Sequence, residues 1–186
     1  MAKKDSYSES LKKDFITLFE ILELNERQKH YLKCRWLDQI LWMEGRANHA
    51  RQRYYQLRLT TIIGGVIVPI LLSLNININN KPSFDSYLKG FTIALSGMVA
   101  ISSSIEEFFN YGERWRHYRR TTEILKVQGW ELFELSGSYA GYKTHEEAFS
   151  NFAGNVETII QSNVEVYVTN ISQESKKQEQ EKTSKL

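Results

Sequence analysis

The sequence predicts an all-α integral membrane protein, in which a two-helix transmembrane hairpin continues into a cytosolic helical bundle. Leu59–Leu74 and Gly90–Ile105 carry no charge, although 25% of the residues in the chain are charged. A helix that crosses the hydrocarbon needs about 20 mostly apolar residues, so both runs suffice if flanking side chains reach the interface. Proline occurs only at positions 69 and 82 and little of the chain alternates between polar and apolar residues, which favours long helices over strands.

Arginines crowd the outer flank of each apolar run: Arg46, Arg51, Arg53 and Arg58 before the first, and Arg114, Arg116, Arg119 and Arg120 after the second. The segment between the runs, Asn75–Lys89, holds few positive charges. By the positive-inside rule this segment lies outside and both termini are cytoplasmic. We therefore expect membrane spans at about 59–78 and 86–105, which together form a hairpin domain over 59–105.

Residues 1–58 are expected to form cytosolic helices. The spacing predicts a first amphipathic helix over Ser8–Leu24. Its apolar face consists of Leu11, Phe15, Leu18 and Leu22. Asn25 is then suited to cap the next helix, because Gln28 stands three residues later in the capping-box position.

The second helix has a regular apolar stripe, whose members alternate steps of four and three residues. They are Trp36, Ile40, Met43, Ala47, Ala50, Tyr54 and Leu57. This heptad spacing predicts a partner helix. The stripe enters the first apolar run without a breaker, so one helix is expected to continue into the membrane. Pro69 either kinks that helix or reflects the greater frequency of proline in membrane helices.

The third helix is expected to begin near Phe84, cross as Gly90–Ile105 and continue without a break into the cytosol. Its stripe runs through Phe108, Tyr111, Trp115, Tyr118, Thr122, Leu125, Gly129 and Leu132. The two stripes leave the bilayer on the same side, so the two helices are expected to pack as an antiparallel pair.

A loop over Gly137–Gly141 is expected to precede a fourth helix, which Thr144 caps together with Glu147 in a T-x-x-E capping box. The apolar face of that helix consists of Ala148, Phe152, Val156, Ile159, Asn163 and Tyr167. Residues 106–170 thus form a cytosolic helical region. Residues 171–186 lack apolar anchors and are expected to be a disordered tail.

Composition and motifs argue against several classes of function. The net charge is +2, whereas a general nucleic-acid binder needs a basic face unmatched by acids. The lone Cys34 allows no internal disulfide and no cysteine-based zinc site, and we expect it to be buried. The four histidines are scattered, and His145 beside Glu146 and Glu147 is explained by helix capping. We therefore expect no enzyme activity, no cofactor and no metal. The N-terminus has no apolar core and is not expected to be a signal peptide.

Small residues gather on one face of the second apolar run, namely Ser96, Ala100, Ser103 and Ser104. Such a face either packs closely against another helix or lines a water-filled pore in an oligomer. Glu106 and Glu107 follow at the cytosolic boundary. In a symmetric ring they form an acidic collar that favours cations; otherwise they are the first solvated residues of the helix. Gly64 and Gly65 allow the same two interpretations, packing or pore lining, in the first run.

The arginines Arg114, Arg116, Arg119 and Arg120 allow two interpretations. They hold anionic lipid headgroups or a phosphorylated ligand, or they set the topology and pair with carboxylates such as Glu113 and Glu123. The sequence favours topology and ion pairing.

Two motifs give the chain a family resemblance: W-x-x-Q-x-x-W at Trp36–Trp42 and E-R-W-R-x-Y-R-R-x-x-E-x-L-K at Glu113–Lys126. With the two apolar runs between them, they resemble a bacterial family of two-span membrane proteins of unknown function that is related to the SLATT domains. The resemblance covers most of Lys29–Val168. It implies a bacterial membrane, a cytosolic helical extension and, from some relatives, a pore-forming effector role, but no catalytic residues.

We therefore expect a homo-oligomeric pore or ion channel, with membrane lipid and ions as its partners and no nucleic acid. Two spans are too few to enclose a conduit, so several subunits are required. The alternative is a membrane-anchored scaffold or adaptor whose cytosolic bundle recruits a partner.

Overall fold

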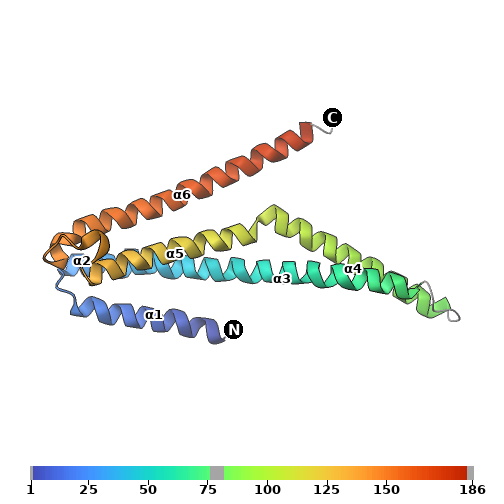
Figure 1. The fold of residues 1–186 in the computed structure, drawn as a ribbon, viewed down its shortest axis with the longest axis horizontal. Coiled ribbons are helices and arrows are strands. Elements are labelled where there is room, and N and C mark those ends of the chain that lie inside the picture. The colour runs from blue at the N-terminus through green and yellow to red at the C-terminus, as the bar shows by residue number, and fades with distance from the viewer. Residues whose placement is uncertain (1, 76–81, 184–186) are drawn as a thin grey trace. The chain divides into compact units, whose positions relative to one another are not determined.

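The computed structural model describes residues 2–75 and 82–183, and every element in this part of the chain is a helix (Figure 1). The predicted all-α class is confirmed. The elements are α1 (Ala2–Ile21), α2 (Glu26–Tyr31), the π-helical turn η1 (Leu32–Leu37), α3 (Asp38–Asn75), α4 (Pro82–Phe109), α5 (Tyr111–Phe133), the 3-10 turn η2 (Gly137–Tyr139) and α6 (His145–Thr183). Of the predicted external segment Asn75–Lys89, residues 76–81 lie outside the described residues, whereas its second half, residues 82–89, is not a loop but the start of α4.

The chain divides into two compact units. Unit 1 comprises Met1–Glu44 and Arg119–Leu186, and unit 2 comprises Gly45–Tyr118. Helices α3 and α5 each contribute residues to both units. The unit boundaries therefore fall inside helices, not at the ends of the apolar runs: one precedes the arginines that begin at Arg46, and the other lies within the arginine cluster, between Tyr118 and Arg119.

The start of the second helix is built as the sequence predicts. The side chain of Asn25 accepts a hydrogen bond from the Gln28 backbone N–H at 3.0 Å, and the Gln28 side chain accepts one from the Asn25 N–H at 3.0 Å. From Glu26 the chain is helical through η1 to the end of α3, and Pro69 lies inside α3. The π-helical turn was not predicted, because no residue pattern separates it from an ordinary helical turn.

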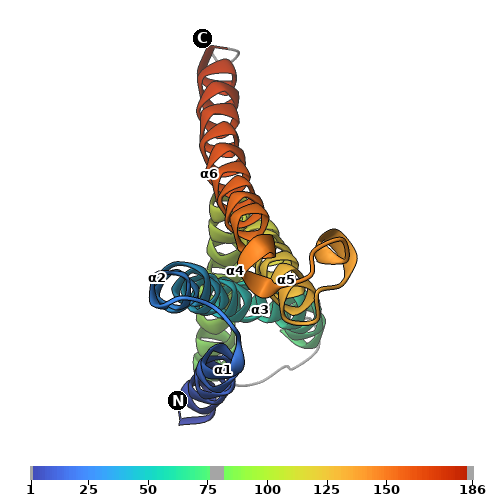
Figure 2. The same cartoon turned by 90° about the vertical axis from the view of Figure 1, so that its left-hand side faces the viewer.

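Trp36 lies at the centre of the core of unit 1. Its ring contacts Phe15 and Phe19 of α1, Phe133 of α5 and Phe152 of α6, with centroid distances of 5.1 to 6.2 Å. Figure 2 shows these helices from the end of the unit. The indole N–H donates a hydrogen bond to the Leu125 carbonyl at 3.0 Å, so the buried polar atom of the ring is satisfied.

The predicted stripe of the second helix is confirmed, since its first five members, from Trp36 to Ala50, are all buried. The predicted faces of the first and fourth helices need correction. Phe19 is buried in α1, whereas Leu22 lies beyond the end of the helix. In α6 the buried position is Ile160 rather than Ile159.

The prediction of an unbroken third helix is wrong. Asn110 has a φ of +48° and separates α4 from α5. Asparagine is among the few residues other than glycine that adopt this left-handed conformation readily. A heptad stripe reports which side chains share a face, and it continues across a single left-handed residue without an obvious interruption.

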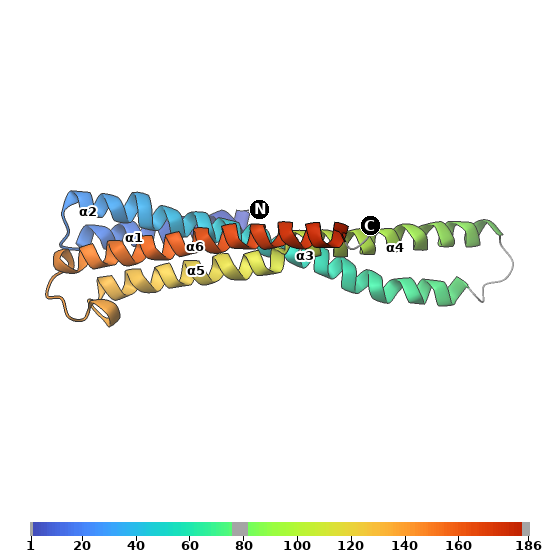
Figure 3. The same cartoon turned by 90° about the horizontal axis from the view of Figure 1, so that it is seen from above.

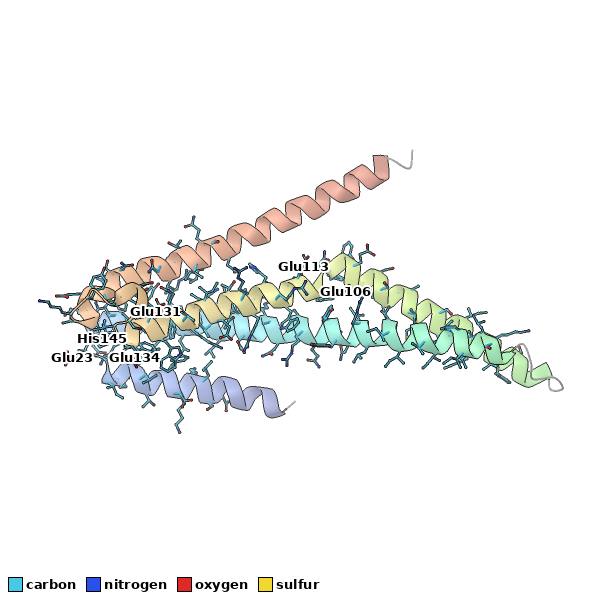
Figure 4. All side chains as sticks on the ribbon, viewed as in Figure 1. Glu23, Glu106, Glu113, Glu131, Glu134 and His145 are labelled. Atoms are coloured by element: carbon cyan, nitrogen blue, oxygen red, sulfur yellow. The ribbon has the colours of Figure 1, made fainter. Side chains whose placement is uncertain are left out.

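The connection from α5 to α6 contains Leu135 and Gly137, both with positive φ, and the buried Tyr139. Figure 4 shows His145 close to the end of α5, and its Nε2 lies 3.1 Å from the Phe133 carbonyl oxygen. The Thr144 hydroxyl accepts a hydrogen bond from the Glu147 N–H at 3.3 Å, which confirms the predicted cap. The Glu147 carboxylate, however, accepts its reciprocal hydrogen bond from Lys143 rather than from Thr144.

The first turns of α6 lie alongside α5 (Figure 3), and the side chains of Thr121 and Asn163 approach to 3.5 Å farther along. Helix α6 continues to Thr183, over a segment for which the sequence predicts a disordered tail. This segment is rich in Glu, Lys and Gln, which have high helix propensity, so a helix needs no apolar anchor to continue there.

Candidate functional site

Helices α3 and α4 meet along a seam inside unit 2. Gly64 is buried in it, and a Cβ built on Gly64 would lie 2.2 Å from Cγ2 of Val99. Buried and half-buried positions at steps of three and four residues mark the seam on both helices: Leu57, Thr61, Gly64, Val68 and Leu71 on α3, and Thr92, Leu95, Val99, Ser102 and Glu106 on α4. Gly64 is thus a packing glycine, whereas Gly65 is exposed with no atom within 4 Å of a built Cβ.

The small-residue face lies beside this seam and not in it. Ser96, Ala100, Ser103 and Ser104 are all exposed. The hydroxyls of Ser96 and Ser104 donate to the carbonyl oxygens of Thr92 and Ala100, at 2.8 and 3.0 Å. These residues share one side of α4 because their spacing of three, four and seven residues returns to the same helical face. We call this the outer face of α4.

A shallow apolar hollow of about 440 Å³ opens at the C-terminal end of α4. It is lined by Ala100, Ile101, Ser104, Ile105, Phe108 and Phe109. The outer face therefore borders an apolar surface on one side and the α3–α4 seam on the other.

The two glutamates at the end of α4 lie on different sides of the helix. Glu106 is half-buried and continues the spacing of the seam, whereas Glu107 is exposed and lies eleven residues, three helical turns, after Ser96 on the outer face. Only Glu107 therefore extends the small-residue face, and the predicted collar of both carboxylates separates into one seam residue and one outer-face residue.

Arg119 takes part in an ion-pair network inside unit 1. Its guanidinium donates to Glu44 Oε1 at 2.6 Å and lies 2.9 Å from Glu123 Oε1. Glu44 is almost fully buried, with 4% of its side chain exposed, and its second oxygen lies 3.6 Å from Nζ of Lys126. For Arg119 and Glu123 the ion-pair interpretation is confirmed. Arg114 is half-buried, and Arg116 and Arg120 are exposed.

Glu44 was missed because it stands directly after the buried Met43, and a charge beside a core position is usually solvated. Its partners are 75 and more residues away along the chain, so only the packing of α3 against α5 reveals the network. A glutamate next to a heptad position, with arginines on the partner helix, is the signal that could have indicated it.

A groove of about 940 Å³ lies between α2, η1 and α6 in unit 1. At one side of it the carboxylate of Glu157 accepts hydrogen bonds from the Tyr31 hydroxyl at 2.7 Å and from the Arg35 guanidinium at 2.9 and 2.6 Å. Hydrogen bonding to Arg35 lowers the pKa of Glu157, and burial together with the bond to Glu157 raises the pKa of Tyr31. The network keeps Glu157 anionic and Tyr31 neutral around neutral pH.

Cys34 also lines this groove, and it is exposed, contrary to the expectation that it is buried. Its Sγ lies 3.7 Å from Nδ1 of His30. Among the residues that the structure describes, no three His, Cys, Asp or Glu side chains gather in a group that could hold a metal ion.

Gly64→Val is expected to destabilise the α3–α4 seam, because its side chain would overlap Val99. Overpacking of this kind costs about 1–3 kcal/mol. Gly65→Val is the matched control, since it introduces the same side chain one residue away in open space. Thermal unfolding of the protein in detergent gives the midpoint temperature of each variant. Equal midpoints for the two variants would contradict close packing at Gly64.

Residues 38–147 match a family described as a protein of unknown function, DUF4231. The matched residues are more than half of the chain, and they include the seam, the outer face and the motif at Glu113–Lys126. Trp36 lies just before them. Comparison with curated proteins and with solved structures gives no significant match.

Proposed function

Because this chain belongs to the DUF4231 family, whose function is unknown, we propose from its own geometry that it forms a homo-oligomeric membrane pore or ion channel. The observation that carries the proposal is the outer face of α4. The seam with α3 uses the side that carries Val99, which leaves a neighbouring face of small and hydroxyl-bearing residues uncovered in the single chain. Such a face suits a helix that meets other copies around a conduit.

Insertion in a membrane is supported by the exposure of the two apolar stretches. Among the described residues, the helices spanning Glu26–Ser73 and Ser86–Phe109 are long and apolar enough to cross a bilayer. Only 6% and 11% of their most apolar windows are buried within the chain, whereas a core helix of a water-soluble bundle would be mostly buried. The arginines outside both runs support, by the positive-inside rule, the proposal that both termini lie in the cytoplasm of a bacterial cell. The relationship to SLATT domains is part of this proposal.

A ring of copies would line its conduit with Ser96, Ala100, Ser103 and Ser104. The small size of these four residues leaves room for water, and the hydroxyl oxygens of the three serines retain lone pairs that accept hydrogen bonds from it. Glu107 would repeat once per subunit at the cytosolic end and attract cations. Lipid would cover the exposed apolar side of α4, which includes Met98 and Ile101.

The alternative is a membrane-anchored scaffold. The groove between α2, η1 and α6 favours it, since a 940 Å³ depression of mixed polar and apolar character is large enough to receive part of a partner. In this case the apolar helices serve as the anchor and the outer face of α4 packs against other helices.

Conductance separates the two functions. Purified protein of defined oligomeric state in planar bilayers is expected to pass current, and Ser103→Trp is expected to lower unitary conductance several-fold by filling the conduit. Met98→Trp is the matched control, because Met98 is exposed on the opposite side of α4 and its substitution should leave conductance unchanged. Glu107→Gln should reduce the preference for cations over anions.

A protein that is monomeric in mild detergent and in bilayers, or that passes no current across ions and voltages, would overturn the pore and leave the scaffold. Equal effects of Ser103→Trp and Met98→Trp would show that the outer face does not line the conduit.

A further inference from the structure

We propose that Asn110 is a hinge that sets the direction of the end of α4, and that straightening this hinge changes the cytosolic mouth of the pore. The second part rests on the proposed function; the first part does not. Figure 1 shows the bend at the junction of α4 and α5, and Figure 4 places Glu106 and Glu113 on its two sides.

Asn110 takes part in backbone hydrogen bonds on both sides of the bend. The Asn110 N–H donates to the Glu106 carbonyl at 2.9 Å, as in a continuing helix. The Asn110 carbonyl accepts from the N–H groups of both Glu113 and Arg114, at 3.1 Å each, which starts α5. One residue therefore ends one helix and begins the next. Its change from the left-handed to the right-handed conformation would join the two helices into one straight helix, with the Glu113 N–H moving from the Asn110 carbonyl to the Phe109 carbonyl.

The bent form is held by a contact just beyond the hinge. A Cβ built on Gly112 would lie 2.9 Å from Cε2 of Tyr54, so the Tyr54 ring sits directly on the backbone of the first turn of α5. Trp115, one turn later, contacts the rings of Tyr54 and Tyr55, at 6.4 and 6.1 Å between centroids. This aromatic clasp ties the start of α5 to α3, and the bend at Asn110 gives α4 a different direction from α5.

A hinge with one positive-φ residue and one clasp provides two discrete arrangements. With the clasp closed, Asn110 keeps its positive φ, which asparagine tolerates better than most residues but which is still less favourable than the right-handed conformation. With the clasp open, this difference favours the straight helix. Glu107 lies less than one turn before the hinge, so its position relative to α5 differs between the two arrangements.

The experiment measures a distance across the hinge. Spin labels replace Met98 and Arg116 in the full-length chain with Cys34→Ser, which removes the native cysteine. These positions are 18 residues apart, five full turns, and would be separated by about 27 Å along a straight helix. Pulsed electron resonance in lipid nanodiscs should give a shorter main distance for the parent chain.

Asn110→Ala, which disfavours positive φ, should move the main distance towards the straight-helix value, and Tyr54→Ala should increase the straight population. Asn110→Gly is the matched control, because glycine adopts the left-handed conformation freely and should keep the parent distance. Thermal unfolding of each variant verifies that it folds. An Asn110→Ala distance identical to that of the parent would overturn the hinge.

Single-channel recording of the same variants tests whether the hinge controls opening at the cytosolic mouth of the pore. Asn110→Ala should change open probability at least several-fold, whereas Asn110→Gly should change it less. A conducting parent whose open probability is unaffected by Asn110→Ala would overturn the gating role. Absence of current in every variant, the parent included, would overturn the proposed function while the distance measurement still decides the hinge.

Discussion

Gly129→Ala is expected to destabilise unit 1, by about 1–3 kcal/mol, although it adds only one methyl group. A Cβ built on Gly129 would lie 2.2 Å from Cζ2 and 2.7 Å from Cη2 of Trp36. The indole ring of Trp36 has no space to move away from the added methyl group, because it is fully buried, surrounded by aromatic rings and hydrogen-bonded to the Leu125 carbonyl. The two helices must separate or the ring must leave its rotamer, and either change loses packing.

Gly154→Ala is the matched control on α6. Gly154 is exposed and no atom lies within 4 Å of a built Cβ, so alanine should stabilise the helix by about 0.5–1 kcal/mol. Thermal unfolding of the full-length protein in detergent, followed by circular dichroism and tryptophan fluorescence, should show opposite shifts for the two variants. A Gly129→Ala midpoint at or above that of the parent would contradict the contact with Trp36.

Arg119→Met is expected to have the second large effect. It removes the strongest partner of Glu44, a carboxylate with 4% exposure, and leaves only Lys126 at 3.6 Å. Removal of one member of a buried pair costs about 3–5 kcal/mol. Because 46% of the Arg119 side chain is exposed and Lys126 remains, we expect a smaller loss, of about 2 kcal/mol.

Two further variants test whether the loss comes from the unmatched charge on Glu44. Arg120→Met changes the exposed neighbouring arginine and should alter the free energy of unfolding by less than about 0.5 kcal/mol. The double variant Glu44→Gln with Arg119→Met removes the buried charge and should recover part of the stability. A double variant as unstable as the sum of the two single variants would show that the charges are not coupled.

The helical elements and the main stripe were predicted because they depend on local order. Asn25 and Gln28 cap a helix through residues that are neighbours in sequence, and the spacing from Trp36 to Ala50 repeats with the helical period. The apolar runs and their flanking arginines are likewise evident from the sequence alone. The same information placed Gly129 on the buried face, although not its contact with the Trp36 ring.

Other features depend on which helices meet. Asn110 fits the middle of a helix as well as a bend, and the contact of Gly112 with Tyr54 connects residues 58 positions apart. The outer face of α4 could be told from its seam only once Gly64 was seen against Val99. The assignment of Glu106 to the seam and Glu107 to the outer face likewise depended on knowing which side of α4 meets α3.

The sequence by itself determined that this chain is helical, where its caps lie and which runs are apolar enough for a membrane, because helix period, capping and hydrophobicity are properties of neighbouring residues. The tertiary structure decided which face of α4 is left uncovered, that Glu44 pairs with Arg119, and that the third helix bends at Asn110. These features depend on contacts between residues far apart in the chain, whose energies exceed the small local preferences that a sequence displays.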